Sequence, residues 1–273
     1  KYPKVFSPFY INLIKSGEVS GNLENTFNYL ADHLEKQYYL VSRVRGAMIY
    51  PACVLFAFTA VLILMLTVVV PKLTVILKET GQELPFLTKM IINASDFMRV
   101  MWWLVLLILI GLVGGVWQYV KTAKGKRMFD LIKLKAPIFG KLFQKVYLAR
   151  FSENFSTLIK GGLPILQALQ ISGEVVGNTI FSDLIFEAKE QVRVGNTISS
   201  VFEKHPEIPP MVSQMISTGE KSGQIDFILA KIASFYSQEV DNSVKNLSAL
   251  IEPILIVLLG GGVIILLVAI LMP

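Results

Sequence analysis

Residue types capable of acid–base, nucleophilic or metal chemistry are scarce in this chain. It has two histidines, His33 and His205, far apart in the sequence, and a single cysteine, Cys53, with no partner for a disulfide or metal framework. It contains no His-x-x-x-His pair, no Gly-x-x-x-x-Gly-Lys-Ser/Thr phosphate loop and no Gly-x-Ser-x-Gly nucleophile turn. We therefore interpret both histidines as helix-surface or loop residues. We expect no catalytic residue, no metal and no cofactor, and predict that the chain is not an enzyme.

A glutamate flanked by glycine and serine is the remaining polar motif, and the pattern Gly-Glu-x-Ser-Gly occurs twice. Its residues are Gly17, Glu18, Ser20, Gly21, Gly219, Glu220, Ser222 and Gly223. In a structural interpretation, the first glycine ends one helix, the serine and second glycine begin the next, and the glutamate hydrogen-bonds the turn. In a functional interpretation, the glutamate forms a salt bridge with a partner protein. The sequence leaves both interpretations open.

The motif belongs to a longer internal repeat with a constant offset of 202 residues. Residues 8–71 align with residues 210–273 without a gap, and 14 of the 64 aligned positions are identical, among them Pro51 with Pro253. Both copies run from a polar helical region into a long apolar stretch. The repeat therefore predicts a duplicated unit in which a helix pair continues into a membrane span.

The apolar content predicts an integral membrane protein. Hydrophobic residues make up 53% of the chain and charged residues only 17%, which is unusual for a soluble domain. Residues 46–71, 100–120 and 253–273 carry no charge. Each window reaches the roughly 20 residues that a bilayer-spanning helix needs, so we expect three transmembrane helices rather than buried helices of a large soluble protein. The first window begins too far behind a charged helix to be a cleaved signal peptide.

The distribution of Lys and Arg predicts the orientation in the membrane. Of 26 basic residues, 16 lie in 121–252 and six in 1–45, whereas 72–99 holds only four. Because cytoplasmic segments carry the excess of basic residues, we expect a cytoplasmic N-terminus and a periplasmic or extracellular C-terminus. The same bias accounts for the net charge of +6. No basic stripe interleaved with aromatic residues accompanies it, so we expect no nucleic-acid binding.

Glycines and prolines divide the polar segments into helices, and no strand-length alternation of apolar and polar residues occurs. We expect helices over 147–160, 164–176, 179–194, 197–204 and 211–218, and a long helix from about 223. The predicted fold is all-α, with three transmembrane helices and helical-bundle cytoplasmic domains related by the internal repeat. The predicted order is a partial first cytoplasmic helical domain (1–50), a first span (51–71), an outer loop (72–99), a second span (100–120), a second cytoplasmic bundle (121–252) and a third span (253–273).

Prolines and glycines mark the predicted spans. Pro51 and Pro253 lie where each long helix enters its span, and proline removes a backbone hydrogen bond there, so both are candidate hinges. Small residues let helices approach closely. The candidate packing positions are Gly111, Gly114, Gly115, Gly260, Gly261 and Gly262. They serve packing within the protein or docking of another protein's apolar helix, and we expect the chain to self-associate.

The doubled motif, the long helix after it and an Ala-x-Ile-x-Pro segment at each membrane entry resemble a known family. It is the family of inner-membrane platform proteins of type IV pilus and type II secretion machines, the F family (PilC/GspF). Residues 149–169 and 83–88 resemble the same family. The resemblance covers essentially the whole chain, but members carry a full first cytoplasmic bundle and usually an N-terminal extension. We therefore expect the front of the first bundle to be missing here.

This resemblance implies a non-enzymatic hub in the bacterial inner membrane. It implies that the cytoplasmic bundles face a hexameric assembly ATPase and that the spans handle pilin or pseudopilin helices, with other machine components and membrane lipid as further contacts. ATPase motion would then drive the extraction and polymerisation of pilin subunits. One alternative is a small-molecule permease, which the lack of charged residues in the spans disfavours. The other is a membrane-anchored binding module with passive spans.

Overall fold

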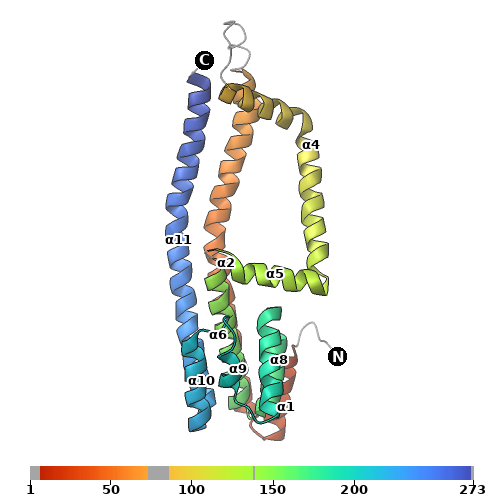
Figure 1. Cartoon of the computed structure of the whole chain (residues 1–273), viewed down its shortest axis with the longest axis vertical. Helices are drawn as coiled ribbons and strands as arrows, with labels where there is room; N and C mark the ends of the chain where they lie inside the picture. The colour runs from red at the N-terminus through yellow and green to blue at the C-terminus, as the bar shows by residue number, and fades with distance from the viewer. Residues whose placement is uncertain (1–6, 73–85, 138, 272–273) are drawn as a thin grey trace. The chain divides into compact units, whose positions relative to one another are not determined.

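The structure, a computed structural model, describes residues 7–72, 86–137 and 139–271 (Figure 1). In these ranges every regular element is a helix and no strand occurs, which confirms the predicted all-α fold for the described part of the chain. In chain order the elements are α1 (Pro8–Val19), α2 (Leu23–Leu64), the π-helical segment η1 (Met65–Val69), α4 (Phe86–Val120), α5 (Ala123–Lys135), α6 (Phe139–Lys160), α7 (Ile165–Val175), α8 (Thr179–Arg193), α9 (Ile198–Phe202), α10 (Pro210–Ser222) and α11 (Ile225–Leu271).

The helices form two compact units. The first, here named the bundle unit, consists of residues 1–44 and 122–244, and the second, the span unit, consists of residues 45–121 and 245–273. The long helices α2 and α11 each contribute residues to both units. Each of the other described helices belongs to one unit. After α4 the chain passes from the span unit to the bundle unit between Lys121 and Thr122.

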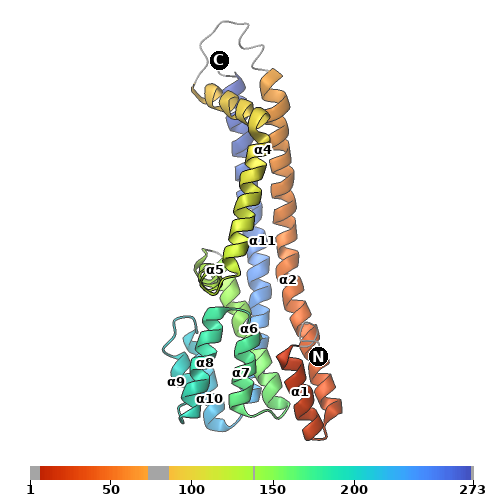
Figure 2. The same ribbon diagram turned by 90° about the vertical axis from the view of Figure 1, so that its right-hand side faces the viewer.

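The core of the bundle unit is built around α6, which buries residues on all of its faces. Phe151, Phe155 and Leu158 are at most 1% exposed, and the Phe151 and Phe202 rings lie 5.5 Å apart. α7 and α8 pack against each other, and α7 also packs on α6 (Figure 2). One buried hydroxyl of α6 joins it to α11: Ser156 Oγ donates to the backbone oxygen of Asp226 at 2.8 Å. Burial of a helix on every side is the arrangement expected for the centre of a bundle.

Local stop and start signals place most of the helix ends near their predicted positions. α6 ends at Lys160, directly before two glycines, and α8 begins after Asn178, whose Oδ1 accepts a hydrogen bond from the Ile180 amide at 2.9 Å. The start of α6 was predicted at residue 147 but lies at Phe139. Pro137 lies two residues before this start, outside the helix, and it separates α6 from α5: the residue before a proline avoids the helical conformation, and Ala136 has a ψ of 128°.

The span unit contains the apolar segments. Three helical stretches of the described chain, within Leu23–Lys72, Val100–Val120 and Ile225–Ile264, are long and apolar enough to cross a membrane, and each overlaps one of the predicted windows. α4 bends at Met101, whose φ of −114° and ψ of 21° are not helical, so its apolar part is set off from its first turns (Figure 1). Ser95 Oγ on α4 donates to the Leu66 backbone oxygen in η1 at 2.5 Å.

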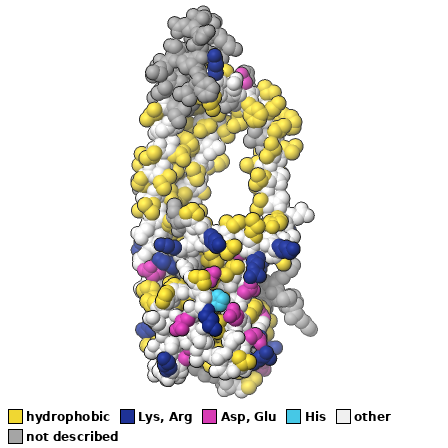
Figure 3. Space-filling view, viewed as in Figure 1, with side chains coloured by type: hydrophobic (Ala, Val, Ile, Leu, Met, Phe, Trp, Pro, Cys, Tyr) yellow, Lys and Arg dark blue, Asp and Glu magenta, His cyan; other side chains and the backbone are white. Residues whose placement is uncertain are grey.

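Apolar side chains cover much of the surface of these three stretches. Trp102, Trp103, Ile110 and Val257 are all more than half exposed. Figure 3 shows hydrophobic side chains along these helices, whereas most of the visible Lys, Arg, Asp and Glu side chains lie on the bundle unit. A contiguous apolar surface of this extent is stable in lipid or against other apolar helices, and not in water.

Candidate functional site

The first copy of the repeated motif forms the turn between α1 and α2. α1 continues through Gly17 and ends at Val19, so the first glycine does not end the helix as predicted. Gly21 adopts the left-handed conformation, with a φ of 67°, and the Asn22 amide donates back to the Gly17 oxygen at 2.8 Å. The second glycine therefore ends the helix, because a residue without a Cβ reaches positive φ without strain.

The second copy forms the same turn between α10 and α11. α10 continues through Gly219 to Ser222, Gly223 has a φ of 69°, and the Gln224 amide donates to the Gly219 oxygen at 3.0 Å. The first glycine of each motif instead permits close packing of the two helices. A Cβ on Gly219 would lie 3.2 Å from Ile228 side-chain atoms, and one on Gly17 would collide with the Thr26 side chain.

This close approach gives a prediction for Gly17→Ala. Because the added methyl group overlaps Thr26, we expect the variant to lose about 1 to 2 kcal/mol of unfolding free energy. The matched control is Gly46→Ala, where no atom lies within 4 Å of the added methyl group and alanine is the better helix former. Denaturant unfolding of the purified full chain in detergent measures both. Equal stability of the two variants would contradict the packing role of Gly17.

Glu220 bonds the start of another helix rather than its own turn. Its carboxylate accepts hydrogen bonds from the Ile198 amide at 2.5 Å, the Ser199 amide at 3.2 Å and Ser199 Oγ at 2.6 Å. These amides are at the beginning of α9, where the first N–H groups of a helix lack partners within the helix. A carboxylate there also interacts favourably with the helix dipole. In the second copy of the motif, the glutamate therefore has a structural role, which is to bond the first amides of α9.

Glu18, at the matching position of the first copy, lies in a different setting. Its side chain is exposed, and in the described part of the chain it forms no hydrogen bond or ion pair. The two glutamates occupy the same position of the same turn, but only Glu220 has its oxygens bonded. Of the two, Glu18 is therefore the one whose carboxylate is available to a partner protein, and that role stays a hypothesis.

A groove within the bundle unit lies between α2, α6 and α11. It has a volume of about 350 Å³ and is lined on the α11 side by small residues, including Ala230, Ala233 and Ser237. Ion pairs cross it. Lys36 Nζ on α2 lies 2.8 Å from Glu153 Oε1 on α6.

A second set of contacts closes the groove between α2 and α11. Tyr39 Oη donates to Asp241 Oδ2 at 2.5 Å, and Arg43 Nε lies 3.9 Å from Asp241 Oδ1. The Arg43 guanidinium also sits 4.8 Å from the centre of the Tyr39 ring. Tyr39 and Asp241 are separated by 202 residues, which is the offset of the repeat.

α6 and α11 are joined by a further charged contact. Lys145 Nζ lies 2.7 Å from Glu239 Oε2 and 3.0 Å from Ser243 Oγ. Hydrogen bonds, first from Lys145 and then from Asn242, hold the pKa of Glu239 below its usual value. The carboxylate is therefore ionised at neutral pH, and charged contacts of this kind set the register of one helix against another.

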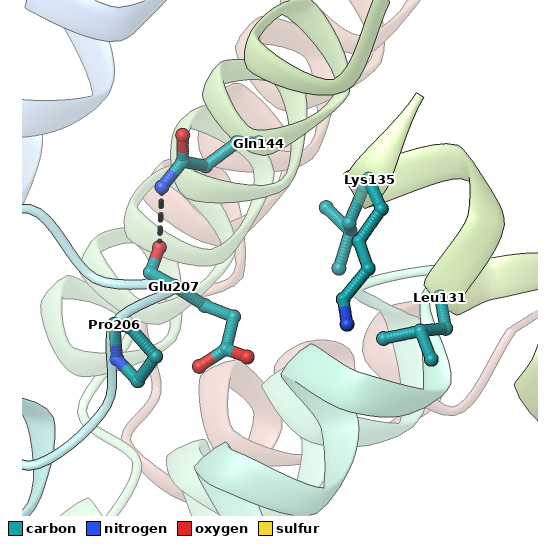
Figure 4. Close-up of a pocket in the computed structure, with 6 residues that line it drawn as sticks. Leu131, Lys135, Gln144, Pro206 and Glu207 are labelled. Carbon is teal, nitrogen blue, oxygen red and sulfur yellow. Dashed lines mark hydrogen bonds between the residues drawn. The ribbon is translucent and has the colours of Figure 1, made fainter. Parts of the chain in front are cut away.

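A smaller cleft of about 180 Å³ lies between α5, α6 and the segment before α10. Leu131, Lys135, Gln144, Pro206 and Glu207 line it (Figure 4). The Lys135 and Glu207 side chains point toward each other from opposite walls, and Gln144 Nε2 donates to the Glu207 backbone oxygen at 2.8 Å (Figure 4). The hydrogen bond fixes the chain before α10, and the cleft carries no set of groups arranged for catalysis.

The histidines and the cysteine lie apart from these features. His33 is buried and stacks on Phe9 with ring centres 4.1 Å apart, so it is a core residue and not the surface or loop residue predicted from the sequence. His205 Nε2 lies 3.1 Å from Glu187 Oε2 near the surface. Cys53 is exposed on α2. In the described residues no group of three or more His, Cys, Asp or Glu side chains could hold a metal ion.

The candidate hinge prolines and packing glycines all lie within helices, and their roles in bending and in docking stay predictions. Pro51 and Pro253 are inside α2 and α11, so the hinge remains a prediction. A Cβ on Gly262 would lie 3.3 Å from the Phe58 ring, which indicates packing between two of the apolar helices. The other five positions have no atom within 4 Å of an added Cβ, so their surface is open in a single chain; they are Gly111, Gly114, Gly115, Gly260 and Gly261.

Asp130 was missed by the sequence reasoning. This residue of α5 is 3% exposed, and its Oδ2 accepts a hydrogen bond from the Thr179 amide at 3.0 Å, at the start of α8. Lys133 Nζ lies 3.1 Å from Asp130 Oδ1. The available signal was an isolated acidic residue among basic ones on α5, but its partner is 49 residues away and no local pattern identifies it.

Comparison with known proteins places this architecture among secretion and pilus proteins. The chain matches the family described as type II secretion system (T2SS), protein F, over residues 1–71 and 151–273. It is 38% identical over 258 residues to the type IV pilus assembly protein PilC of Thermus thermophilus, covering 94% of this chain and 64% of that protein. It is 35% identical over 270 residues to PilC of Pseudomonas aeruginosa, covering 97% of this chain and 72% of that protein.

Secretion proteins are similar as well. The type II secretion system protein F of Aeromonas hydrophila is 33% identical over 274 residues, covering 100% of this chain and 70% of that protein. The chain thus spans about two thirds of the length of these relatives. Their names and the three apolar helices together indicate a component of the inner membrane.

Proposed function

Because the chain belongs to the type II secretion system protein F family, we propose that it is a non-enzymatic platform in the inner membrane that couples a cytoplasmic assembly ATPase to pilin or pseudopilin subunits. In this proposal the bundle unit faces the ATPase, with a cytoplasmic N-terminus and a periplasmic C-terminus. The spans contact pilin helices, and the chain self-associates. The machine is a type IV pilus, a type II secretion system or a related assembly.

The observation that carries the proposal is the extent of α2 and α11. Each is one helix that contributes both to the charged bundle unit and to an apolar stretch of membrane-spanning length. The Lys36–Glu153 ion pair joins α2 to α6 within the bundle unit, and a helix continuous with a span from there is suited to transmit a force into the bilayer. A passive anchor does not need helices of this length.

The matching turns and the Tyr39–Asp241 contact support the proposed duplication. The two copies have the same left-handed glycine and the same return hydrogen bond. Tyr39 and Asp241 are equivalent positions of the repeat and are in contact, so the two copies meet at that pair. Duplicated helices would let both spans respond to one motor.

The test of the platform role uses the protein in its native cell. Purification from membranes is expected to bring with it a hexameric ATPase and a prepilin. Pro253→Ala is expected to reduce fibre assembly or secretion several-fold, because it restores a backbone hydrogen bond and stiffens the entry to the third span. Membrane insertion should be unchanged. The control is Ile254→Ala, an exposed neighbour on the same helix, which should assemble normally.

Two results would contradict the platform role. One is purification without any ATPase or prepilin under conditions that retain the membrane complex. The other is saturable solute movement by the purified chain in liposomes, which would establish the permease alternative. Normal assembly by Pro253→Ala would count against the hinge while leaving the platform role to be decided by co-purification.

A further inference from the structure

α5 is tied by the covalent chain to the end of an apolar span. The apolar stretch Val100–Val120 of α4 ends three residues before α5 begins at Ala123. Three residues of extended chain reach at most about 11 Å, so the first turn of α5 lies within that distance of the last turn of the span. That first turn is therefore near the level of the lipid headgroups when α4 is in a bilayer.

One face of α5 is fixed against the bundle unit. Asp130 is buried and accepts the Thr179 amide hydrogen, while Asn178 Nδ2 donates to the Asp130 backbone oxygen at 3.4 Å. Figure 1 shows α5 running across the direction of α6 and α8, with which it is in contact. Asp130 therefore fixes the rotation of α5 about its own axis.

The opposite face is apolar and exposed. At about 100° per residue, a position two residues from Asp130 points roughly 200° away, on the far side of the helix. Ile132 is such a position and is 51% exposed, and the adjacent Phe129 is 39% exposed. This face turns away from the bundle unit because Asp130 holds the other one.

The flanks of the exposed face are basic. α5 carries Lys124, Lys126, Arg127, Lys133 and Lys135 against the single acidic residue Asp130. Arg127 lies 3.3 Å from Asp183, and Asp130 is bonded within the fold. Lys124 and Lys126 are exposed, and among the described residues neither forms an ion pair. A helix with a bulky apolar face and basic flanks is the type that lies in the interface of an anionic membrane.

We propose that α5 is an interfacial helix that binds anionic phospholipid on the same leaflet into which α4 ends. Ile132 and Phe129 insert at the boundary between headgroups and acyl chains, and Lys124 and Lys126 contact the phosphate groups. A second copy of this chain is a poorer occupant of the face, because two helices with this excess of basic residues repel each other. The short connection to the span keeps the first turn of α5 close to the end of that span.

The test measures the depth of Ile132 in a bilayer. The full chain carries Cys53→Ser and Ile132→Cys with a spin label, in nanodiscs of phosphatidylcholine containing phosphatidylglycerol. Collisions with oxygen, which concentrates in lipid, are compared with collisions with a water-soluble nickel complex. The matched control is Val194→Cys, 68% exposed just after α8 and at the opposite end of that helix from Thr179. We expect oxygen to dominate at 132 and the nickel complex to dominate at 194.

The second arm tests the charge. The label at 132 is also placed in a Lys124→Gln, Lys126→Gln background and in nanodiscs of phosphatidylcholine alone. Each change is expected to shift the ratio of inserted to withdrawn helix by roughly ten-fold or more, since a basic residue near an anionic surface contributes about 1 kcal/mol. Far-UV circular dichroism confirms that each variant stays folded.

Three outcomes would overturn the proposal. A label at 132 that collides mainly with the nickel complex shows α5 in water. A label shielded from both reagents shows a contact with protein, such as a second copy. Equal insertion in both lipid compositions and in the glutamine variant shows that anionic headgroups are not the ligand. None of these readouts depends on an ATPase or a prepilin, so failure here is distinct from failure of the platform role.

Discussion

Glu220→Ala is expected to lower the unfolding free energy by about 2 to 3 kcal/mol, whereas Glu18→Ala is expected to change it by less than about 0.5 kcal/mol. The two residues occupy the same position of the same repeated turn, which makes them a matched pair. The Glu220 carboxylate accepts three hydrogen bonds at the start of α9, and its removal leaves two backbone amides of that helix without a partner. The exposed Glu18 carboxylate has no such bond among the described residues.

Hydrogen exchange of the full chain in detergent measures this difference where it arises. A loss of 2 kcal/mol corresponds to roughly thirty-fold faster exchange, which we expect at the Ile198 and Ser199 amides. Glu220→Gln retains one acceptor oxygen without the charge and should give an intermediate value. Unchanged protection of α9 in Glu220→Ala would show that these hydrogen bonds contribute nothing in solution.

The same pair separates the structural and partner roles of the motif. Glu18→Lys reverses an exposed charge without breaking a bond in the described fold, so a loss of ATPase co-purification in that variant reports a partner contact directly. Glu220→Lys also disrupts the start of α9, and its effect on partners mixes both causes. Normal co-purification by Glu18→Lys would leave only the structural role for the motif.

The parts of this fold that sequence predicts are those set by neighbours in the chain or by bilayer thickness. The glycines at 161 and 162, the Asn178 cap and the three apolar windows each act within a few residues, or through a length that the membrane fixes. The end of α10 was predicted four residues early because Gly219 looks like a helix stop, whereas its close approach to Ile228 explains its small size. Sequence alone does not distinguish a glycine needed for packing from one needed for positive φ.

Contacts between distant residues were beyond sequence reasoning for a different reason. The bonds from Asp130 to Thr179 and from Tyr39 to Asp241 depend on which helix faces are brought together. Helical periodicity says that a face exists but not which helix covers it. For His33 the same limit gave a wrong environment: the sequence around it mixes polar and apolar residues, and only the docking of α1 places Phe9 on its ring.

The burial of His33 predicts that acid destabilises the packing of α1 on α2. Burial, and to a lesser extent the charge of Lys36, lowers the pKa of His33 from 6.5 to about 4. The Tyr10 ring, 6.4 Å away on α1, has a pKa raised by burial and stays neutral, so it offers no compensating charge. The neutral imidazole of His33, which extends from α2, is therefore the form that packs against Phe9 of α1.

The sign of the effect follows from this lowered pKa. The unfolded chain binds a proton at His33 near pH 6.5 and the folded chain only near pH 4. The stability due to the neutral ring is thus complete above pH 6.5, declines as the pH falls toward 4, and declines no further below it. A difference of this size corresponds to about 3 kcal/mol, or roughly a three-hundred-fold change in the opening of α1 when the loss is complete.

Hydrogen exchange of the α1 amides between pH 7.5 and 4.5, corrected for the intrinsic pH dependence of exchange, measures this loss. Glutamate side chains begin to take up protons at the lower end of this window, so the variants decide whether the change belongs to His33. His33→Phe is the decisive variant: phenylalanine stands at the equivalent position of the second copy, Phe235, keeps the stacking on Phe9 and cannot be protonated. Its α1 protection should be flat with pH. His205→Gln removes the other histidine, at the surface, and should retain the decline. Loss of the decline in His205→Gln, or its persistence in His33→Phe, would assign the acid sensitivity to a group other than His33.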